Sequence, residues 1–476
     1  MAEQRVVIGV DSSTQATKAL AVDIDTGEVV GEGRARHTVS TGAGRESDPE
    51  QWWEALVEAA ALTGWADRAA ALSVAGQQHG LVTLDRAGRP VRPALLWNDV
   101  RSAPQAARLR DAFGAAETAR RTGSVPTAAF TAAKWAWLRT DEPAAADRVA
   151  AVRLPHDFLT ERLTGEAVTD RGDASGTGWW GPDGYDPDVL ARIGLDPGLL
   201  PRVLAPGARA GTVRPGLPLR EGAPVATGTG DNMAAALGLG LLPGQPVLSL
   251  GTSGTVYAVG RTRPADPSGT VAGFADALGG WLPLACTLNC TLAVDRFAAL
   301  LGRGREEVED GGTAVVLPYL DGERTPDLPG ASGLVHGLRH DTTRGQLLQA
   351  AYDGAAHALL TALDGVLLAG GEDPRGDEPL LLIGGGARGR AWQRTVLRLS
   401  GRPVQVPVAR ELVALGAAAQ AAALLTGEPA DAVARRWRTA DGPVLEAVER
   451  DDDALERIGD TLRRAGALQG APAEDR

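Results

Sequence analysis

Apolar runs broken by small polar turns predict a three-stranded meander at the start of the chain. We expect strands over residues 5–10 and 18–23, joined by the turn Asp-Ser-Ser-Thr-Gln-Ala-Thr at 11–17. A second turn at 25–27 then leads to a third strand over 28–32. The chain is therefore predicted to begin with a small antiparallel sheet.

A helix is predicted to follow this meander. The run Asp48-Pro49-Glu50-Gln51 supplies an expected N-cap, a first-turn proline and a capping-box glutamine. Trp52, Leu56 and Ala59 recur at helical spacing, so we expect the helix to bury them on one face.

Strands and helices alternate through the rest of the chain, which predicts an α/β protein. The Pro- and Gly-rich stretch 181–222 should form loops and short strands, and a break at Pro243-Gly244 suggests domains at 1–243 and 244–476. Further expected elements are a strand at 70–76 with 81–85 returning from it, a strand running into a helix at 225–242, a hairpin at 247–260, a long helix at 344–370, strands at 380–384 and 404–408, a helix at 391–401, and a short amphipathic helix from about residue 451.

Two of the predicted hairpins are alike. The apolar runs VVIGV and VLSL lead into turns of small or hydroxyl residues at 11–17 and 251–255. Such turns let backbone N–H groups point at an anion without obstruction. Either turn could be a plain connection, but two at the start of two halves suggest a duplication, with two similar lobes facing one ligand.

The composition limits the possible ligands. The chain has 476 residues, 60 acidic against 48 basic, and a net charge of −12. This field repels phosphates, which argues against a general nucleic-acid or membrane-surface binder. Any phosphate must be held by local geometry, and Lys18 and Lys134 are the two lysines in an otherwise Arg-based chain.

The two cysteines and the N-terminus predict a reduced, cytoplasmic protein. Cys286 and Cys290 fit neighbouring buried thiols better than a zinc site, which would need two further ligands. The N-terminal sequence resembles no secretory leader, and no apolar run reaches the length of a membrane span.

A glycine-rich turn follows the predicted strand at 380–384. Gly384, Gly385, Gly386 and Ala387 open a G-x-G-x-x-G pattern, but the next strand lacks the acid that would bind a ribose. A dinucleotide-binding oxidoreductase is therefore disfavoured, and a turn that a nucleotide can approach closely remains plausible.

Two aspartates are candidates for chemistry. Asp231 stands where a strand gives way to a helix, either as an N-cap or as a general base for a substrate hydroxyl. Asp11 ends the first strand, either as a turn-capping residue or as a carboxylate that meets phosphate through a divalent cation.

Polar and aromatic pairs are candidates for sugar recognition. Gln78-His79 and Trp97-Asn98 offer donors, acceptors and an aromatic face suited to sugar hydroxyls. The alternative is structural: a core histidine, and a packed tryptophan before a polar turn.

Taken together, these stretches resemble the FGGY carbohydrate kinases from Val7 to about Ala423. The resemblance implies an α/β fold of two actin-like, ribonuclease-H-like ATPase lobes with ATP in an interdomain cleft. It is carried by VDSSTQATK, AGQQHGLVTLD, PALLWNDVR, FTAAKWAWL, LPHDFLTERLTGE, GTGDN, LSLGTSG, LPYLDGERTP, LIGGGARGRAW and the segment 333–353.

The resemblance also implies roles for individual residues. Asp231 falls on the family's catalytic base, and Asp11 on the acid near the metal and phosphates. The implied sugar contacts are Gln78, His79, Trp97, Asn98, Asp231 and Asn232, and the implied ATP contacts are Ser13, Thr14, Lys18, Gly251, Thr252, Ser253, Gly384, Gly385, Gly386 and Ala387.

The implied activity is Mg²⁺-assisted transfer of phosphate from ATP to the terminal hydroxyl of D-xylulose, with a possible homodimer and no nucleic-acid or membrane partner. Family members acting on this sugar commonly carry Met-His where this chain has Gln78-His79, and the first turn reads Asp-Ser-Ser-Thr instead of Asp-x-Gly-Thr. Ribulose, gluconate or glycerol are therefore alternative substrates, and a non-kinase actin-like ATPase is the alternative class.

Overall fold

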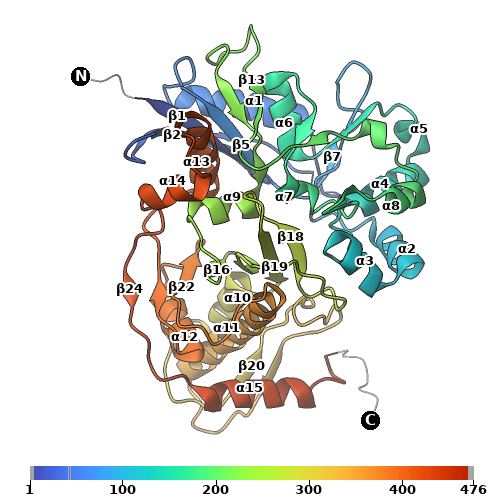
Figure 1. Cartoon of the computed structure of the whole chain (residues 1–476). Coiled ribbons are helices and arrows are strands. Elements are labelled where there is room, and N and C mark those ends of the chain that lie inside the picture. Colours follow the sequence, from blue (N-terminus) through green and yellow to red (C-terminus); the bar gives the residue numbers. More distant parts are fainter. Residues whose placement is uncertain (1–4, 41, 43, 470–476) are drawn as a thin grey trace. The chain divides into compact units, whose positions relative to one another are not determined.

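The computed structural model describes residues 5–40, 42 and 44–469, which form two compact units (Figure 1). The first unit combines three stretches of chain, Met1–Leu241, Arg263–Leu282 and Ala409–Ala440. The second contains Leu242–Thr262, Pro283–Val408 and Asp441–Arg476. The division at residue 243 stays a prediction about where the family's two domains meet.

The first unit is built on a mixed sheet whose strand order is β13-β14-β5-β1-β2-β3, with β15 also beside β5. The predicted meander is confirmed, because β2 pairs antiparallel with both β1 and β3, while β5 pairs parallel with β1. The strands are β1 Val6–Ser12, β2 Ala16–Asp23, β3 Val29–Arg36, β5 Leu72–Gly76, β13 Arg209–Thr212, β14 Pro224–Ala226 and β15 Thr229–Gly230.

Helix α13 (Leu412–Thr426) packs on this sheet although it comes late in the sequence. Its backbone approaches β1 so closely that a Cβ on Gly9 would lie 2.0 Å from the Ala414 carbonyl oxygen. The contact with α9 (Asp231–Gly238) is equally tight, since a Cβ on Gly416 would lie 1.8 Å from the Ala234 oxygen. Glycine is required at both positions.

Helix α1 (Pro49–Leu62) covers the sheet with Trp52, Leu56 and Ala59, which are buried as predicted. Asp48 caps it by accepting from the Glu50 amide. The predicted capping box is wrong: the Gln51 side chain accepts from the backbone and hydroxyl of Thr38 instead. A residue outside the helix has thus taken the place of the helix N-cap as the hydrogen-bond partner of the Gln51 side chain.

The remaining elements of the first unit lie outside the strand order of this sheet. The expected return of 81–85 along the preceding strand is wrong, because β6 (Val82–Leu84) pairs antiparallel with β8 (Ala151–Arg153). Stretch 181–222 forms loops and short strands, as predicted, and also two short helices that were not predicted. The other elements are β4 Glu46–Ser47, β7 Ala94–Leu95, α2 Ala103–Phe113, α3 Ala115–Thr122, α4 Thr131–Asp141, α5 Pro143–Ala146, α6 Pro155–Thr164, β9 Val168–Thr169, α7 Arg171–Ala174, β10 Trp180–Gly181, β11 Gly184–Tyr185, α8 Pro187–Ile193, η1 Pro197–Leu199, β12 Arg202–Val203, β18 Ala272–Ala275 and α14 Ala430–Arg436.

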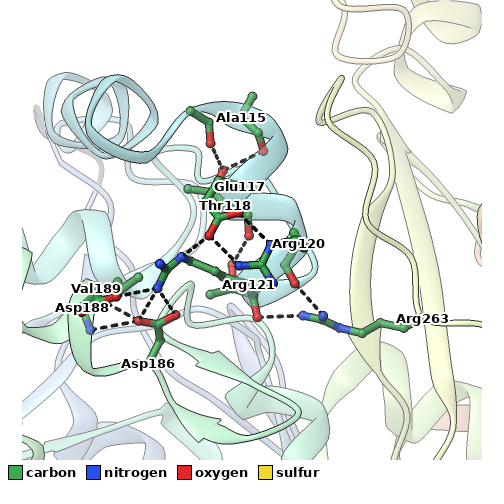
Figure 2. Close-up of polar contacts among 11 residues, drawn as sticks. Ala115, Glu117, Thr118, Arg120, Arg121, Asp186, Asp188, Val189 and Arg263 are labelled. Carbon is green, nitrogen blue, oxygen red and sulfur yellow. Dashed lines mark hydrogen bonds and ion pairs between the residues drawn. The ribbon is translucent and has the colours of Figure 1, made fainter.

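An arginine-centred network joins segments of the first unit that are distant in sequence. Arg121 on α3 contacts Glu117 and the carboxylates of Asp186 and Asp188 at the start of α8 (Figure 2). Arg263 donates to the Arg120 and Arg121 carbonyl oxygens, which binds segment 263–282 to the end of α3.

The second unit has a sheet in the order β19-β17-β16-β22-β23-β24. The predicted hairpin, long helix and C-terminal amphipathic helix are all present. Its elements are β16 Pro246–Leu250, β17 Gly254–Ala258, β19 Trp281–Thr287, α10 Thr291–Leu301, β20 Val315–Leu317, β21 Leu334–His336, α11 Arg344–Ala369, β22 Leu380–Ile383, α12 Arg390–Ser400, β23 Val404–Gln405, β24 Val444–Leu445 and α15 Asp452–Arg464.

The two sheets repeat one topology. In each, a hairpin strand pairs antiparallel with the next strand on one side and parallel with a later strand on the other. The order β3-β2-β1-β5-β14 in the first unit corresponds to β19-β17-β16-β22-β23 in the second. The expectation of two similar lobes is confirmed at the level of strand order and direction.

Two smaller expectations can also be compared with the structure. Cys290 is buried as expected, whereas Cys286 is half-buried and both thiols are free. In the described part of the chain, no single helix has the length and apolar character of a membrane span, although the bent pair α13–α14 passes by length and composition alone.

Candidate active site

The first hairpin brings a carboxylate and an ammonium group face to face. Strands β1 and β2 continue to the pair Ser12–Thr17, so the turn is shorter than the predicted 11–17, and Asp11 lies directly opposite Lys18. Asp11 is thus a strand residue and not a turn cap. Strand pairing, in place of a flexible loop, fixes the position of its side chain.

Asp11 is a buried acid with incomplete compensation. The residue is 4% exposed, and its Oδ2 lies 3.8 Å from Lys18 Nζ. Lys18 makes a closer contact, 2.5 Å, with Glu411 Oε2. The pKa of Asp11 is raised to about 7, chiefly by burial; the charge of Lys18 opposes this shift, and the charges of Asp231 and Glu411 contribute to it.

Asp231 begins α9 but does not cap it. Gly230 is the N-cap, and Asp231 Oδ1 accepts from the amide and side chain of Asn232 at 2.8 and 3.0 Å. Burial raises the pKa of Asp231 to about 7, and the negative charge of Asp173 adds to this effect. The capping alternative for Asp231 is therefore wrong, and its other oxygen remains available for chemistry.

Gln78 and Asn232 lie beside this carboxylate. Asn232 Nδ2 donates to Gln78 Oε1 at 2.7 Å. A Cβ on Gly230 would lie 2.7 Å from Gln78 Cγ, so this side chain packs against the helix start. Gln78 Nε2 is buried with no hydrogen-bond partner among the described residues. The structure thus brings three predicted sugar contacts together.

His79 is held in an unusual conformation near the same segment. Its φ is +63°, and its Nδ1 lies 2.6 Å from the Gly176 carbonyl oxygen. A carbonyl can only accept, so Nδ1 carries a proton. The ring also packs against Phe130 and Phe274. Tertiary contacts thus position His79 firmly.

The pair Trp97-Asn98 reaches the first hairpin. Trp97 is 40% exposed and its Nε1 donates to Thr14 Oγ1 at 3.1 Å. In the neighbouring turn, Ser13 Oγ donates to the Ala16 carbonyl. Asn98 Oδ1 is buried and lacks a hydrogen-bond partner within the described ranges. Trp97 is thus a half-exposed surface residue and not a packed core tryptophan.

In the second unit, the other hairpin and the glycine turn meet. The pair Leu250–Gly254 closes the hairpin, and the Gly386 amide donates to the Leu250 carbonyl at 2.8 Å. A Cβ on Gly384, whose φ is +85°, would lie 2.8 Å from that same oxygen. The structure therefore places the turn of Gly384, Gly385, Gly386 and Ala387 against Leu250, the residue that precedes Gly251.

The first turns of α10 support this second hairpin. The amides of Thr291 and Leu292 donate to the carbonyl oxygens of Gly251 and Thr252 at 3.1 and 3.4 Å. The loop before α10 is held in turn by buried Glu323, which accepts from the Leu288 and Asn289 amides at 2.5 and 3.2 Å.

Sequence reasoning missed several residues that adjoin these sites. Glu411 contacts Lys18 from 393 positions away, so no local signal could have identified it. Gln77 is 1% exposed, and neither of its amide atoms has a hydrogen-bond partner in the described chain. Its place beside Gln78 was a usable signal. A third omission is a buried histidine–aspartate cluster beneath Asp231, discussed below.

Comparison with known proteins establishes the family. Residues 6–238 match the N-terminal domain of the FGGY family of carbohydrate kinases, and residues 247–425 match its C-terminal domain. The chain belongs to this family and is a carbohydrate kinase, an enzyme that transfers phosphate from ATP.

Several proteins of known name or structure are similar to this chain. The xylulose kinase of Streptomyces coelicolor is 69% identical to this chain, over 100% of the chain and 99% of the relative. The crystal structure of xylulose kinase from Bifidobacterium adolescentis, 34% identical, superposes with a TM-score of 0.86 over 96% of this chain and 99% of that one. The gluconate kinase of Lactobacillus acidophilus, 18% identical, gives a TM-score of 0.88 over 98% and 99%, so the fold itself does not select the sugar.

Proposed function

We propose that this chain is an ATP-dependent kinase that phosphorylates the terminal hydroxyl of D-xylulose. The observation that carries the chemistry is the grouping of the Asp231 carboxylate with Gln78 and Asn232 at one strand-to-helix junction. The sugar is inferred from the likeness to xylulose kinases, which extends over the whole chain. Both parts of the proposal can be tested separately.

Asp231 is the proposed general base. In our mechanism its carboxylate accepts the proton of the attacking hydroxyl as the oxygen–phosphorus bond forms. A pKa of about 7 suits this role, because the group is ionised in an appreciable fraction at neutral pH and holds a proton well. Asn232, which donates to Oδ1, keeps the carboxylate in one orientation.

Unpartnered buried amide groups fit a ligand rich in hydroxyls. Gln78 Nε2, Asn98 Oδ1 and both amide atoms of Gln77 lack hydrogen-bond partners among the described residues. Leaving such a group unsatisfied costs about 1–3 kcal/mol. A sugar that supplies both donors and acceptors would remove this cost, and an apolar ligand would not.

The nucleotide contacts are proposed on the two hairpins and the glycine turn. Ser13, Thr14 and Lys18 on the first hairpin, and Gly251, Thr252 and Ser253 on the second, supply hydroxyl, ammonium and backbone groups that suit phosphates. Gly384, Gly385, Gly386 and Ala387 form the proposed adenosine-side turn, where missing side chains allow close approach.

The residues also fit a magnesium ion that arrives with ATP. Asp11 Oδ1 is a buried carboxylate oxygen with no hydrogen-bond partner in the described chain, and such an oxygen suits Mg²⁺. When bound, Mg²⁺ neutralises charge on the β- and γ-phosphates. Homodimerisation and a cytoplasmic location stay predictions.

A different sugar is the alternative, and Gln78 is the observation in its favour. An amide in place of the expected methionine adds a buried donor that could select another hydroxyl pattern. A coupled assay of ADP release over D-xylulose, D-ribulose, gluconate and glycerol decides between them. We expect the highest kcat/KM with D-xylulose; a higher value for any other compound would overturn the sugar assignment and leave the kinase class intact.

A further inference from the structure

A buried histidine sits among three aspartates in the first unit. His156, on α6, is fully buried, and its Nδ1 lies 2.9 Å from Asp173 Oδ2. Its Nε2 lies 3.3 Å from Asp157 Oδ1 and 3.7 Å from Asp170 Oδ1. None of these residues belongs to the site described above, yet the arrangement concentrates charge in a place without solvent.

The cluster is connected to Asp231 through one hydroxyl. Thr229, buried in β15 two residues before Asp231, donates from Oγ1 to Asp170 Oδ2 at 2.7 Å. The imidazole also packs under the strand ends, because a Cβ on Gly228 would lie 3.0 Å from His156 Cδ2 and a Cβ on Gly76 3.1 Å from His156 Cβ. The ring therefore supports the strands that lead into Asp231 and Gln78.

The same cluster is connected to His79 through α7. Asp170 caps this short helix by accepting from the Gly172 and Asp173 amides. After it, the Gly176 amide donates to the Asp173 carbonyl at 2.9 Å, and the Gly176 carbonyl accepts from His79 Nδ1 at 2.6 Å. One short turn is thus hydrogen-bonded to Thr229, near Asp231, at its start and to His79 at its end.

The carboxylates around His156 favour its protonated form. Burial alone would lower the pKa of His156, but the carboxylates of Asp157, Asp173 and Asp170 raise it to about 9. A protonated His156 hydrogen-bonds to Asp173 from Nδ1 and has the carboxylates of Asp157 and Asp170 near Nε2, so it compensates charge that would otherwise be buried alone. Removing it is expected to disturb the whole turn.

We propose that His156 is a positioning residue for phosphoryl transfer, holding α7 so that its start fixes Asp231 through Thr229 and its end fixes His79 through Gly176. The inference rests on the proposed function in taking Asp231 as the base and His79 as a sugar contact. His156 touches neither substrate, and it acts through these two residues.

The test removes the hydrogen bond between Thr229 and Asp170 without removing a charged group. Thr229→Val deletes the hydroxyl at nearly constant volume, and Thr229→Ser retains it. We expect Thr229→Val to lower kcat at least tenfold while the KM for ATP stays within twofold, and Thr229→Ser to remain within threefold of the wild type in both. A kcat for Thr229→Val within threefold of the wild type would overturn the proposal, even if the variant melts at a lower temperature.

Thr227→Val is the matched control. Thr227 is a buried residue two positions earlier, and its hydroxyl donates to the Ala208 carbonyl at 2.7 Å, outside the cluster. We expect this variant to lose thermal stability but keep kcat within threefold. An equal loss of kcat in both variants would show that any buried hydroxyl here matters in the same way, and would overturn the specific role of the cluster.

The experiment also includes a replacement variant and a fixed choice of substrate. If Thr229→Val does not fold, the charge-balanced pair His156→Gln/Asp173→Asn is assayed instead, with the same thresholds. All variants are measured with whichever sugar the wild type uses best, so that a wrong sugar assignment does not affect the outcome. Asp231→Asn in the same series tests the base assignment independently of the cluster.

Discussion

The two hairpins, β1–β2 and β16–β17, occupy the same place in two sheets of the same order, but they differ in charge. The first carries Asp11 and Lys18 on directly opposed positions, and Glu411, the residue before α13, contacts the lysine. The second, residues 249–255, contains hydroxyl residues and glycines and no charged side chain. Its loop is stabilised by backbone contacts with α10 and the glycine turn.

We infer from this difference that the two hairpins, although alike in strand order, have separate tasks. An uncharged loop of small residues can approach a polyanion without like-charge repulsion. A buried carboxylate cannot, unless a cation accompanies the phosphate. We therefore propose that the acid chemistry and the cation belong to the first hairpin, and that the second hairpin contacts only the nucleotide.

The largest expected effect concerns the base of the first unit. Asp231→Asn should retain fold and nucleotide affinity but lower kcat by about 10²–10⁴-fold, because the amide cannot accept the hydroxyl proton. Steady-state ADP release and nucleotide titration measure the two properties. Near-normal turnover would reduce Asp231 to a structural residue at a helix start.

The next effect concerns Asp11 of the first hairpin. Asp11→Asn removes the carboxylate oxygen proposed for Mg²⁺, so we expect kcat to fall by roughly 10²-fold and the Mg²⁺ concentration for half-maximal rate to rise. The matched change on the second hairpin, Ser249→Ala at the corresponding strand position, should leave the Mg²⁺ requirement unaltered. An unchanged Mg²⁺ requirement in Asp11→Asn would contradict the assignment.

Adding a charge to the second hairpin should disturb ATP binding. Ser253→Asp places a carboxylate where we propose that phosphates bind, and we expect the KM for ATP to rise about tenfold, since like charges in contact are strongly unfavourable. Ser253→Ala is the control for loss of the hydroxyl and should stay within about threefold. A KM for ATP that is the same in the aspartate and alanine variants would place the phosphates elsewhere.

Replacing Lys18 tests whether the first hairpin needs a compact ammonium. Lys18→Arg must fit a planar guanidinium between Asp11 and Glu411, and we expect kcat to fall several-fold. The other lysine offers a contrast. Lys134 is fully buried, and its Nζ donates a hydrogen bond to the Ala129 carbonyl. Lys134→Arg should therefore lower the melting temperature more than it lowers kcat. Unchanged kinetics and stability in both variants would leave the two lysines without a special role.

The smallest effect is a pH dependence of stability. The pKa of Asp11 is raised from 3.8 to about 7 on folding, so the native state favours the protonated acid and loses stability as pH rises through about 7. Without nucleotide or divalent cation, Asp11→Asn should therefore melt several degrees above the wild type at pH 8, with the gap closing towards pH 4. A gap that is constant with pH would contradict the raised pKa.

Local patterns predicted most of the elements but not the contacts between distant ones. The meander, α1, α11 and the two hairpins follow from periodicity and turn residues, which act over a few positions. The candidate site was found largely by resemblance. The contacts that were not predicted depend on long-range packing. Glu411 forms an ion pair with Lys18, and Gln51 accepts a hydrogen bond from Thr38 instead of from the start of its own helix.

The return of α13 to the first unit has a consequence for how the chain is made. The face of β1 at Gly9 and the packing surface of α9 stay uncovered until residues 412–426 have left the ribosome, after the bulk of the second unit. At about 5–20 residues per second, that interval lasts tens of seconds. A chain that stops before residue 409 would display this apolar surface permanently, so the last part of the sequence completes the first part of the protein.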